Sequence, residues 1–241
     1  MIPSAAMFHK DYQNLSEGDR RSVQRHVSAL MALLGANVGG HCTYHDDLFV
    51  WFRNLFFTTD PRFDAACGNL DFVLRARLWR LYNLCWAADQ TTGNIVDIGT
   101  YDGKALEVVL RYAGAGRKTY AYDLFDDVPE EARKSDHGPE LYERVKARLA
   151  PFNATVHKGD IRDVTALPER IGFCQIDLNN AEAEGFIFPL VYNRLQPGSI
   201  VIFDDYGFRR YRESALTHQR FLEGKEQVLE LPTGQGLLVK R

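Results

Sequence analysis

Three aspartates directly follow two apolar segments of this chain, where their carboxylates could act together. Asp177 follows Phe173–Ile176, and Asp204 and Asp205 follow Ile200–Phe203. We expect both segments to be strands of an open parallel sheet, which binds ligands outside the carboxyl ends of its strands. Clustered carboxylates repel one another unless one is protonated or a cation lies between them. Because hard oxygen ligands suit Mg²⁺, we predict that all three acids bind magnesium, which could lower the pKa of a substrate hydroxyl. The alternative for Asp205 is that it caps the next helix.

A glycine loop at 94–103, with the sequence Asn-Ile-Val-Asp-Ile-Gly-Thr-Tyr-Asp-Gly, lies between an apolar strand and a predicted helix. This arrangement is typical of a site for a small polar cofactor. A dinucleotide fingerprint reads G-x-G-x-x-G, but Thr100 stands where its middle glycine belongs. The pattern acid-x-G-x-x-x-G resembles the first motif of class I S-adenosylmethionine-dependent methyltransferases, whose loop curves around a methionine moiety. The residues assigned to the cofactor on this basis are Asp97, Gly99, Thr100, Tyr101 and Gly103.

Two further strand ends carry candidate cofactor contacts. Asp123 ends the second predicted strand, 24 positions after Gly99 (123 − 99), where an acid can accept hydrogen bonds from ribose hydroxyls. The alternative is a solvated loop carboxylate. After the third strand, Asp160 could accept from the exocyclic amine of adenine, and the N–H of Ile161 could donate to a ring nitrogen. The alternative for Gly159-Asp160 is an ordinary turn.

Strands and helices alternate from Asn94 onward, and they must position these residues. The predicted strands are 95–98, 119–122, 155–157, 173–176, 199–203, 227–231 and 236–239. The predicted helices between them are 104–112, 139–149, roughly 183–194, and 210–222. Five strand–helix units followed by two closely spaced strands predict an α/β fold. Its sheet is Rossmann-like, mainly parallel and seven-stranded, is flanked by helices, and has an antiparallel last strand. Pro189 should kink the fourth helix or shift its start.

The first part of the chain carries no β-type alternation. We expect residues 1–69 to form a helical N-terminal extension, which could fold over a substrate as a lid. Residues 70–241 would be the S-adenosylmethionine-binding domain, and a helix over 70–88 would lead into its first strand. The aromatic-rich segment 49–57 favours burial in an interface, so we expect a homo-oligomer, a dimer or tetramer.

Six short motifs resemble those of the macrocin and mycinamicin sugar O-methyltransferases. These motifs are Ile95-Val-Asp-Ile-Gly99, Tyr122-Asp123, Lys158-Gly159, Ile176-Asp177, Leu195-x-Pro197-Gly198 and Phe203-Asp-Asp-Tyr206. The separation of 27 positions between Asp177 and Asp204 (204 − 177) also matches the spacing of that family's metal acids. The resemblance extends over roughly 70–241.

The resemblance implies Mg²⁺-dependent transfer of a methyl group from S-adenosylmethionine to a hydroxyl, typically on a natural-product sugar. Carried over by position, Asp177, Asp204 and Asp205 match the metal ligands. Asp177 is also the candidate general base and borders the cofactor site. The chain departs from the family pattern at Asn179, where a second aspartate is usual, and at Leu124–Pro129. An asparagine could still coordinate a metal through its amide oxygen.

Composition restricts the partners. The net charge is −3 and no long cluster of lysine and arginine is present, so we expect no nucleic-acid partner. The most apolar segment is too short to cross a bilayer and no signal peptide is seen, so we expect no membrane association and a cytoplasmic location. The expected partner is a small-molecule acceptor with a hydroxyl, either glycosylated or without a sugar. Three alternatives stay open: a metal-dependent catechol-type O-methyltransferase, a nicotinamide oxidoreductase, and a methyltransferase-like protein that binds the cofactor without methyl transfer.

Overall fold

The computed structural model describes residues 60–67, 78–114, 116–129, 140–164 and 167–241. The chain divides into two units, and nearly all of the described residues fall in the unit that comprises Arg62–Cys67 and Arg80–Arg241. The expected N-terminal extension over 1–69, its lid role and the aromatic segment 49–57 lie largely or entirely outside the described residues. The proposed boundary at 69/70 therefore stays a prediction.

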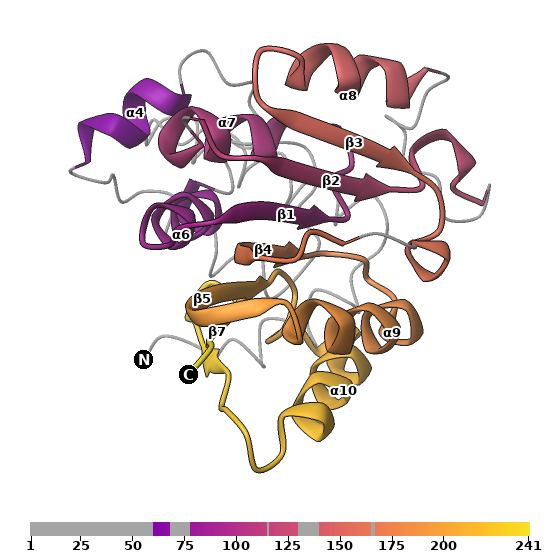
Figure 1. The fold of residues 1–241 in the computed structure, drawn as a ribbon. Helices are drawn as coiled ribbons and strands as arrows, with labels where there is room; N and C mark the ends of the chain where they lie inside the picture. The colour runs from indigo at the N-terminus through magenta and orange to yellow at the C-terminus, as the bar shows by residue number, and fades with distance from the viewer. Residues whose placement is uncertain (1–59, 68–77, 115, 130–139, 165–166) are drawn as a thin grey trace, which may run out of the picture. The chain divides into compact units, whose positions relative to one another are not determined.

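A seven-stranded sheet forms the centre of the described unit (Figure 1). Its spatial order is β3-β2-β1-β4-β5-β7-β6. The strands are β1 (Asn94–Ile98), β2 (Thr119–Asp123), β3 (Ala154–Lys158), β4 (Ile171–Ile176), β5 (Leu195–Phe203), β6 (Leu229–Glu230) and β7 (Gly236–Val239). The strands β1 to β5 pair in parallel, whereas β7 pairs antiparallel with both β5 and β6. The predicted Rossmann-like sheet with an antiparallel last strand is confirmed.

Helices connect and cover these strands. They are α4 (Pro61–Cys67), α6 (Leu78–Asp89), α7 (Lys104–Ala113), α8 (Leu141–Leu149), α9 (Ala181–Tyr192) and α10 (Arg212–Leu222). The helices α9 and α10 pack on each other, while α8 contacts α7 and β3. Among the described residues, no helix is both long and apolar enough to cross a membrane.

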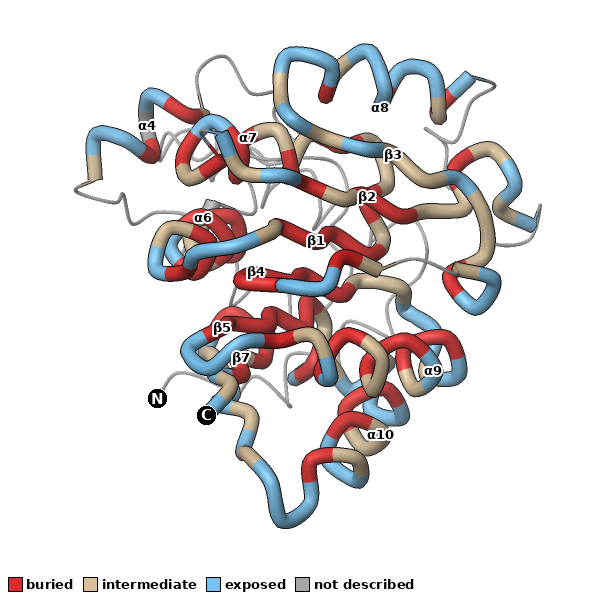
Figure 2. The backbone as a smooth tube through the Cα atoms, in the orientation of Figure 1, coloured by how far each residue is buried: buried red, intermediate tan, exposed pale blue. Residues whose placement is uncertain are grey.

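Burial explains why the strands were recognisable in the sequence. All six residues of β4 are buried, as are four of the five in β1, because neighbouring strands and helices enclose these central strands. Figure 2 shows this concentration of buried residues in β1, β4 and β5. The edge strand β3 has no fully buried residue.

Helix α9 differs from its prediction at both ends. It begins at Ala181, two residues earlier than expected, because the Asn180 side chain caps it by accepting from the N–H groups of Glu182 and Ala183. It continues through Pro189 to Tyr192, where a kink or a shifted start was expected. Proline removes one internal hydrogen bond, and the packing of α9 against α10 and β4 keeps the helix together.

Candidate functional site

The loop after β1 has the backbone shape that its glycines predict. Gly99 has a φ of 90°, and a Cβ placed there would lie 2.0 Å from the carbonyl oxygen of Asp177. Only glycine therefore allows this close approach between the β1 loop and the end of β4. Gly103, with a φ of 73°, precedes α7, and its N–H donates to the carbonyl of Thr100 at 3.0 Å. Tyr101 also adopts a left-handed φ of 53°.

Asp97 lies beneath this loop and is only 4% exposed. Burial raises the pKa of its carboxyl to about 7, and a hydrogen bond with Thr100 acts in the opposite direction. The carboxyl therefore changes charge close to neutral pH. Its position favours an indirect role, in which it supports the loop from inside the protein.

Asp123 at the end of β2 connects two loops. One carboxylate oxygen accepts from the backbone N–H of Tyr101 at 2.7 Å, and the other accepts from the N–H of Phe125 at 2.8 Å. A carboxylate oxygen can accept more than one hydrogen bond, so this arrangement leaves capacity for ribose hydroxyls. The acid thus orders the glycine loop whether or not a nucleoside is bound.

Asp160 is engaged by a neighbouring arginine. Its carboxylate accepts from the backbone N–H of Arg162 at 2.9 Å and forms an ion pair with the Arg162 guanidinium at 2.6 Å. Hydrogen bonds from that side chain hold the pKa of Asp160 below its ordinary value. Asp160 caps the short 3₁₀ helix η3 (Ile161–Asp163), where Ile161 is buried. An adenine amine would have to share this carboxylate with Arg162.

The three predicted metal acids come together at the ends of β4 and β5. One carboxylate oxygen from each of Asp177, Asp204 and Asp205 lies within 4.8 Å of the others. The backbone holds this edge in register, because the N–H of Asp177 donates to Ile98 at 2.8 Å and that of Asp204 donates to Ile176 at 3.0 Å. The end of β1, which carries the glycine loop, thus joins the same ladder.

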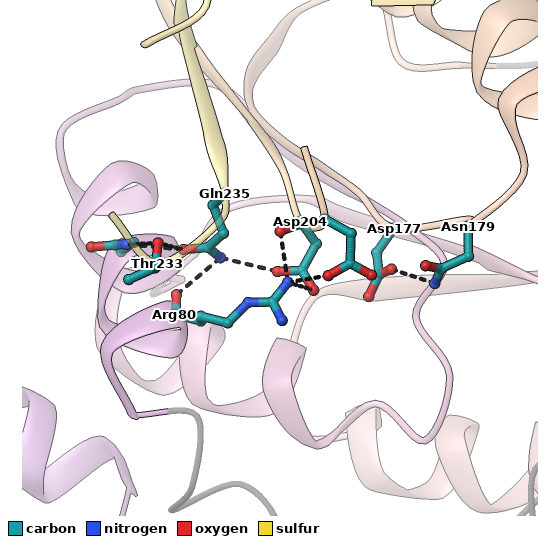
Figure 3. Close-up of polar contacts among 8 residues, drawn as sticks. Arg80, Asp177, Asn179, Asp204, Thr233 and Gln235 are labelled. Carbon is teal, nitrogen blue, oxygen red and sulfur yellow. Dashed lines mark hydrogen bonds and ion pairs between the residues drawn. The ribbon is translucent and has the colours of Figure 1, made fainter. Parts of the chain in front are cut away.

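Arg80 on α6 lies against this cluster and was not predicted as a site residue (Figure 3). Its Nη2 lies 2.5 Å from Oδ2 of Asp204 and 2.7 Å from Oδ1 of Asp205, and it donates to the Asp204 carbonyl at 2.6 Å. Burial alone would lower the pKa of this guanidinium, but the carboxylates of Asp204 and Asp205 outweigh that effect and raise it. The sequence signal was a charged residue on the otherwise apolar face of the helix, because Leu81, Leu84 and neighbouring residues are also buried.

A chain of amides and hydroxyls supports Asp204 on its other side. The Nε2 of Gln235 donates to Oδ1 of Asp204 at 3.0 Å and to the Arg80 carbonyl at 3.3 Å. Its Oε1 accepts from Asn83 at 2.9 Å and from Thr233 at 3.0 Å. Asp204 is therefore a buried acid with partners on both oxygens (Figure 3).

Two alternatives at the acid cluster can be compared with the structure. Asn179, which departs from the family pattern, has a φ of 56° and donates its amide N–H to Oδ1 of Asp177 at 2.9 Å. The 3₁₀ helix η4 (Arg209–Tyr211) and α10 follow Asp205, but their N-cap residues are Phe208 and Tyr211, neither with a side-chain cap. The capping role considered for Asp205 is therefore not found.

A small cavity beside the acids is lined by a second pair of titratable residues, which the sequence analysis did not identify. Glu184 of α9 and His218 of α10 line it together with Asp177 and Asp204. Burial raises the pKa of Glu184 to about 7 and lowers that of His218 to about 3. The 3.4 Å contact between their side chains is thus no ion pair at neutral pH, because the imidazole is uncharged.

The donor set fits Mg²⁺ in its chemistry. Three carboxylates offer hard oxygen ligands within 4.8 Å of one another, and the span across an octahedral Mg²⁺ shell is about 4 Å. Arg80 contributes one positive charge beside the three acids, and a divalent ion would offset more of their negative charge.

Comparisons with known proteins bear on the family and the fold. Residues 96–206 match the model of a methyltransferase domain family, Methyltransf_24. No curated protein matches the sequence. The resemblance to class I methyltransferases expected from the motifs is confirmed.

Solved structures of methyltransferases share the fold. The apo structure of CalS11, a TDP-rhamnose 3'-O-methyltransferase of calicheamicin biosynthesis, superimposes with a TM-score of 0.56 at 17% identity, covering 80% of this chain and 92% of that one. The O-methyltransferase NovP gives 0.55 at 17% identity, with 68% and 80% covered. TomG of Streptomyces achromogenes, an O-methyltransferase of tomaymycin synthesis solved with S-adenosylmethionine, gives 0.50 at 16% identity, with 80% and 96% covered. At these identities the likeness is one of fold.

Proposed function

We propose that this protein transfers a methyl group from S-adenosylmethionine to a hydroxyl of a natural-product sugar or a related small molecule, with the help of Mg²⁺. One observation carries the proposal: the glycine loop and the three acids meet at one edge of the sheet, where Gly99 packs against the backbone of Asp177. The methyltransferase domain over 96–206 supports the donor. The fold shared with CalS11 supports the acceptor class.

In this proposal the donor binds on the loop after β1, and it supplies an activated methyl group on its sulfonium. Gly99 and Gly103 let the backbone approach the ligand closely. Asp123 accepts hydrogen bonds from the ribose hydroxyls while it holds the N–H of Tyr101. Asp160 and the N–H of Ile161 border the adenine.

The acceptor binds at the acids. Asp177, Asp204 and Asp205 would hold Mg²⁺, which supplies a Lewis acid beside the reacting hydroxyl. Asp177 is the proposed general base, and the amide of Asn179 orients its carboxylate by a 2.9 Å hydrogen bond. Most of the acceleration would come from positioning, because the donor already carries the reactive group.

The direct test is methyl transfer from radiolabelled S-adenosylmethionine to a deoxysugar glycoside and to a catechol, with the products identified by mass. We expect glycoside methylation that EDTA abolishes and Mg²⁺ restores. Asp177→Asn should lower kcat by about 100-fold or more, as expected for loss of a general base. The exposed control Asp163→Asn should retain full activity.

The outcomes separate the alternatives. Catechol methylation without glycoside methylation would favour the catechol-type enzyme. Tight binding of S-adenosylhomocysteine without any methylated product would favour a cofactor-binding protein that performs another task. Full activity in EDTA, together with an active Asp204→Ala variant, would remove magnesium from the proposal.

We also propose that the protein is a homo-oligomer. This proposal depends on the aromatic segment 49–57, which lies outside the described residues. Sedimentation of the whole chain tests it, and a stable monomer at micromolar concentration would contradict it.

A further inference from the structure

Arg80 is buried within the group of acids proposed to bind the metal. The residue is 8% exposed, and one terminal nitrogen of its guanidinium contacts Asp204 and Asp205 at 2.5 and 2.7 Å. The plane of the guanidinium lies near the ring of Phe208, with Cζ 5.2 Å from the ring centroid. Its burial and these contacts hold the Arg80 side chain against the acids.

The buried position gives the arginine charge a large influence. Asp204 is 7% exposed, and a buried carboxylate without a compensating charge is strongly unfavourable. Three carboxylates with oxygens within 4.8 Å of one another would also repel. Arg80 supplies a cation that touches two of the three, and Gln235 supplies a neutral hydrogen bond to Asp204.

We propose that Arg80 is a positioning residue that keeps Asp204 and Asp205 together before the metal binds and whose positive charge weakens their affinity for divalent cations. The inference rests on the proposed magnesium site and adds a regulating element to it. The two effects have separate consequences. Loss of Arg80 lowers the stability of the metal-free protein, and it removes one positive charge from beside the acids, which then attract a cation more strongly.

The test compares metal binding by the wild type and by Arg80→Met, which keeps a long apolar stem without the charge. Isothermal titration calorimetry with MgCl₂ and with MnCl₂ measures affinity, and thermal unfolding in EDTA and in 10 mM MgCl₂ measures stability. We expect at least tenfold tighter binding in the variant. We also expect a lower Tm in EDTA and a larger rise in Tm on adding Mg²⁺ than in the wild type.

Arg62→Met is the matched control. Arg62 forms an ion pair with Asp89 at 3.0 Å, is largely exposed and lies outside the acid cluster. Loss of Arg62 removes the same charge from the protein, so the metal affinity of Arg62→Met should stay within twofold of the wild type. Arg80→Lys keeps the local charge, and its affinity should stay within about threefold.

Equal or weaker metal binding in Arg80→Met would overturn the inference and leave the magnesium site itself standing. Absence of binding in both proteins would overturn the inference together with the magnesium part of the proposed function. If Arg80→Met does not fold, Arg80→Gln removes the charge but retains a hydrogen-bond donor, and the same tenfold tightening is required of it. Tenfold tightening in Arg80→Lys would show that charge is not the cause.

Discussion

Asp97 shows how a single buried side chain makes stability depend on pH. Its carboxyl has an ordinary pKa of 3.8, which burial raises to about 7. Between these values the folded chain holds a proton that the unfolded chain has released. The contribution of this group to stability is therefore greatest at low pH and is lost as the pH rises through 7.

Asp97→Asn should remove this dependence, because the amide does not ionise. The free energy of unfolding of the variant, relative to the wild type, should increase by about 2 kcal/mol between pH 5.5 and 8. Urea unfolding at both pH values measures it. Parallel pH profiles for the two proteins would show that the Asp97 carboxyl keeps an ordinary pKa. Calorimetry with S-adenosylhomocysteine on the same variant tests whether the loop above Asp97 loses affinity.

His218 has the opposite effect. Burial lowers the pKa of its imidazole from 6.5 to about 3, so only the unfolded chain binds a proton between these values. Stability is therefore lost as the pH falls below 6.5. The ring stacks on Phe203 at 4.1 Å between centroids and lies near Phe188 and Tyr206, so a phenylalanine should be accommodated.

His218→Phe should lose about 2 kcal/mol less stability than the wild type between pH 7 and 4.5. Glu184 remains in both proteins, so its own titration affects both similarly. Guanidinium unfolding at the two pH values provides the comparison. If His218→Phe loses as much stability as the wild type between pH 7 and 4.5, His218 is protonated in the folded protein.

At the scale of elements, the central strands could be predicted within one or two residues. Short apolar segments bounded by turn residues, such as Ile200–Phe203 after Pro197-Gly198-Ser199, are typical of buried strands. The predicted strand limits are wrong where pairing with a neighbouring strand, rather than the local sequence, determines where a strand begins or ends. Strand β5 begins at Leu195 instead of 199 because Ile171 of β4 pairs with Leu195 across a register shift. Strand β6 contains only Leu229 and Glu230 because β7 offers it just two partners.

The contact between the β1 loop and β4 gives a prediction for one glycine. Gly99→Ala would place a Cβ 2.0 Å from the Asp177 carbonyl oxygen and would also strain a φ of 90°. We expect Gly99→Ala to lower the free energy of unfolding by about 3 kcal/mol or more and to weaken binding of S-adenosylhomocysteine.

Gly116→Ala is the control for backbone strain alone. Its φ of 73° is also left-handed, but a Cβ there meets nothing within 4 Å. Gly116→Ala should lower the free energy of unfolding by only about 1 kcal/mol and leave ligand binding unchanged. Similar losses for the two variants in urea unfolding would contradict a steric role for Gly99.

At the scale of the whole molecule, the site depends on contacts that no local pattern reveals. Arg80 and the Asp204 carbonyl are 124 positions apart, and Gln235 and Arg80 are 155 apart. Sequence reasoning found the acids because they follow recognisable strands. It could not find Arg80 or Gln235, because their roles depend on which elements become neighbours after the sheet forms.

Gln235→Leu tests how much this long-range network contributes. The change removes the donor to Asp204 and the acceptor for Asn83 and Thr233, while it retains a similar volume. We expect a loss of about 2–4 kcal/mol in urea unfolding, because buried polar groups lose their partner. The exposed control Gln227→Leu should change stability by less than about 0.5 kcal/mol. A loss below 1 kcal/mol for Gln235→Leu would show that this network contributes little to stability.

The place of β7 in the sheet has a consequence for biosynthesis. A ribosome makes β5 before β7, so β5 is an open sheet edge until the later strand inserts beside it. Arg80 and the three acids also emerge before Gln235. During translation the arginine can therefore neutralise Asp204 as soon as β5 docks, while the amide partner arrives later. A nascent chain that lacked Arg80 would have to hold three adjacent carboxylates at an unfinished edge without this counter-charge.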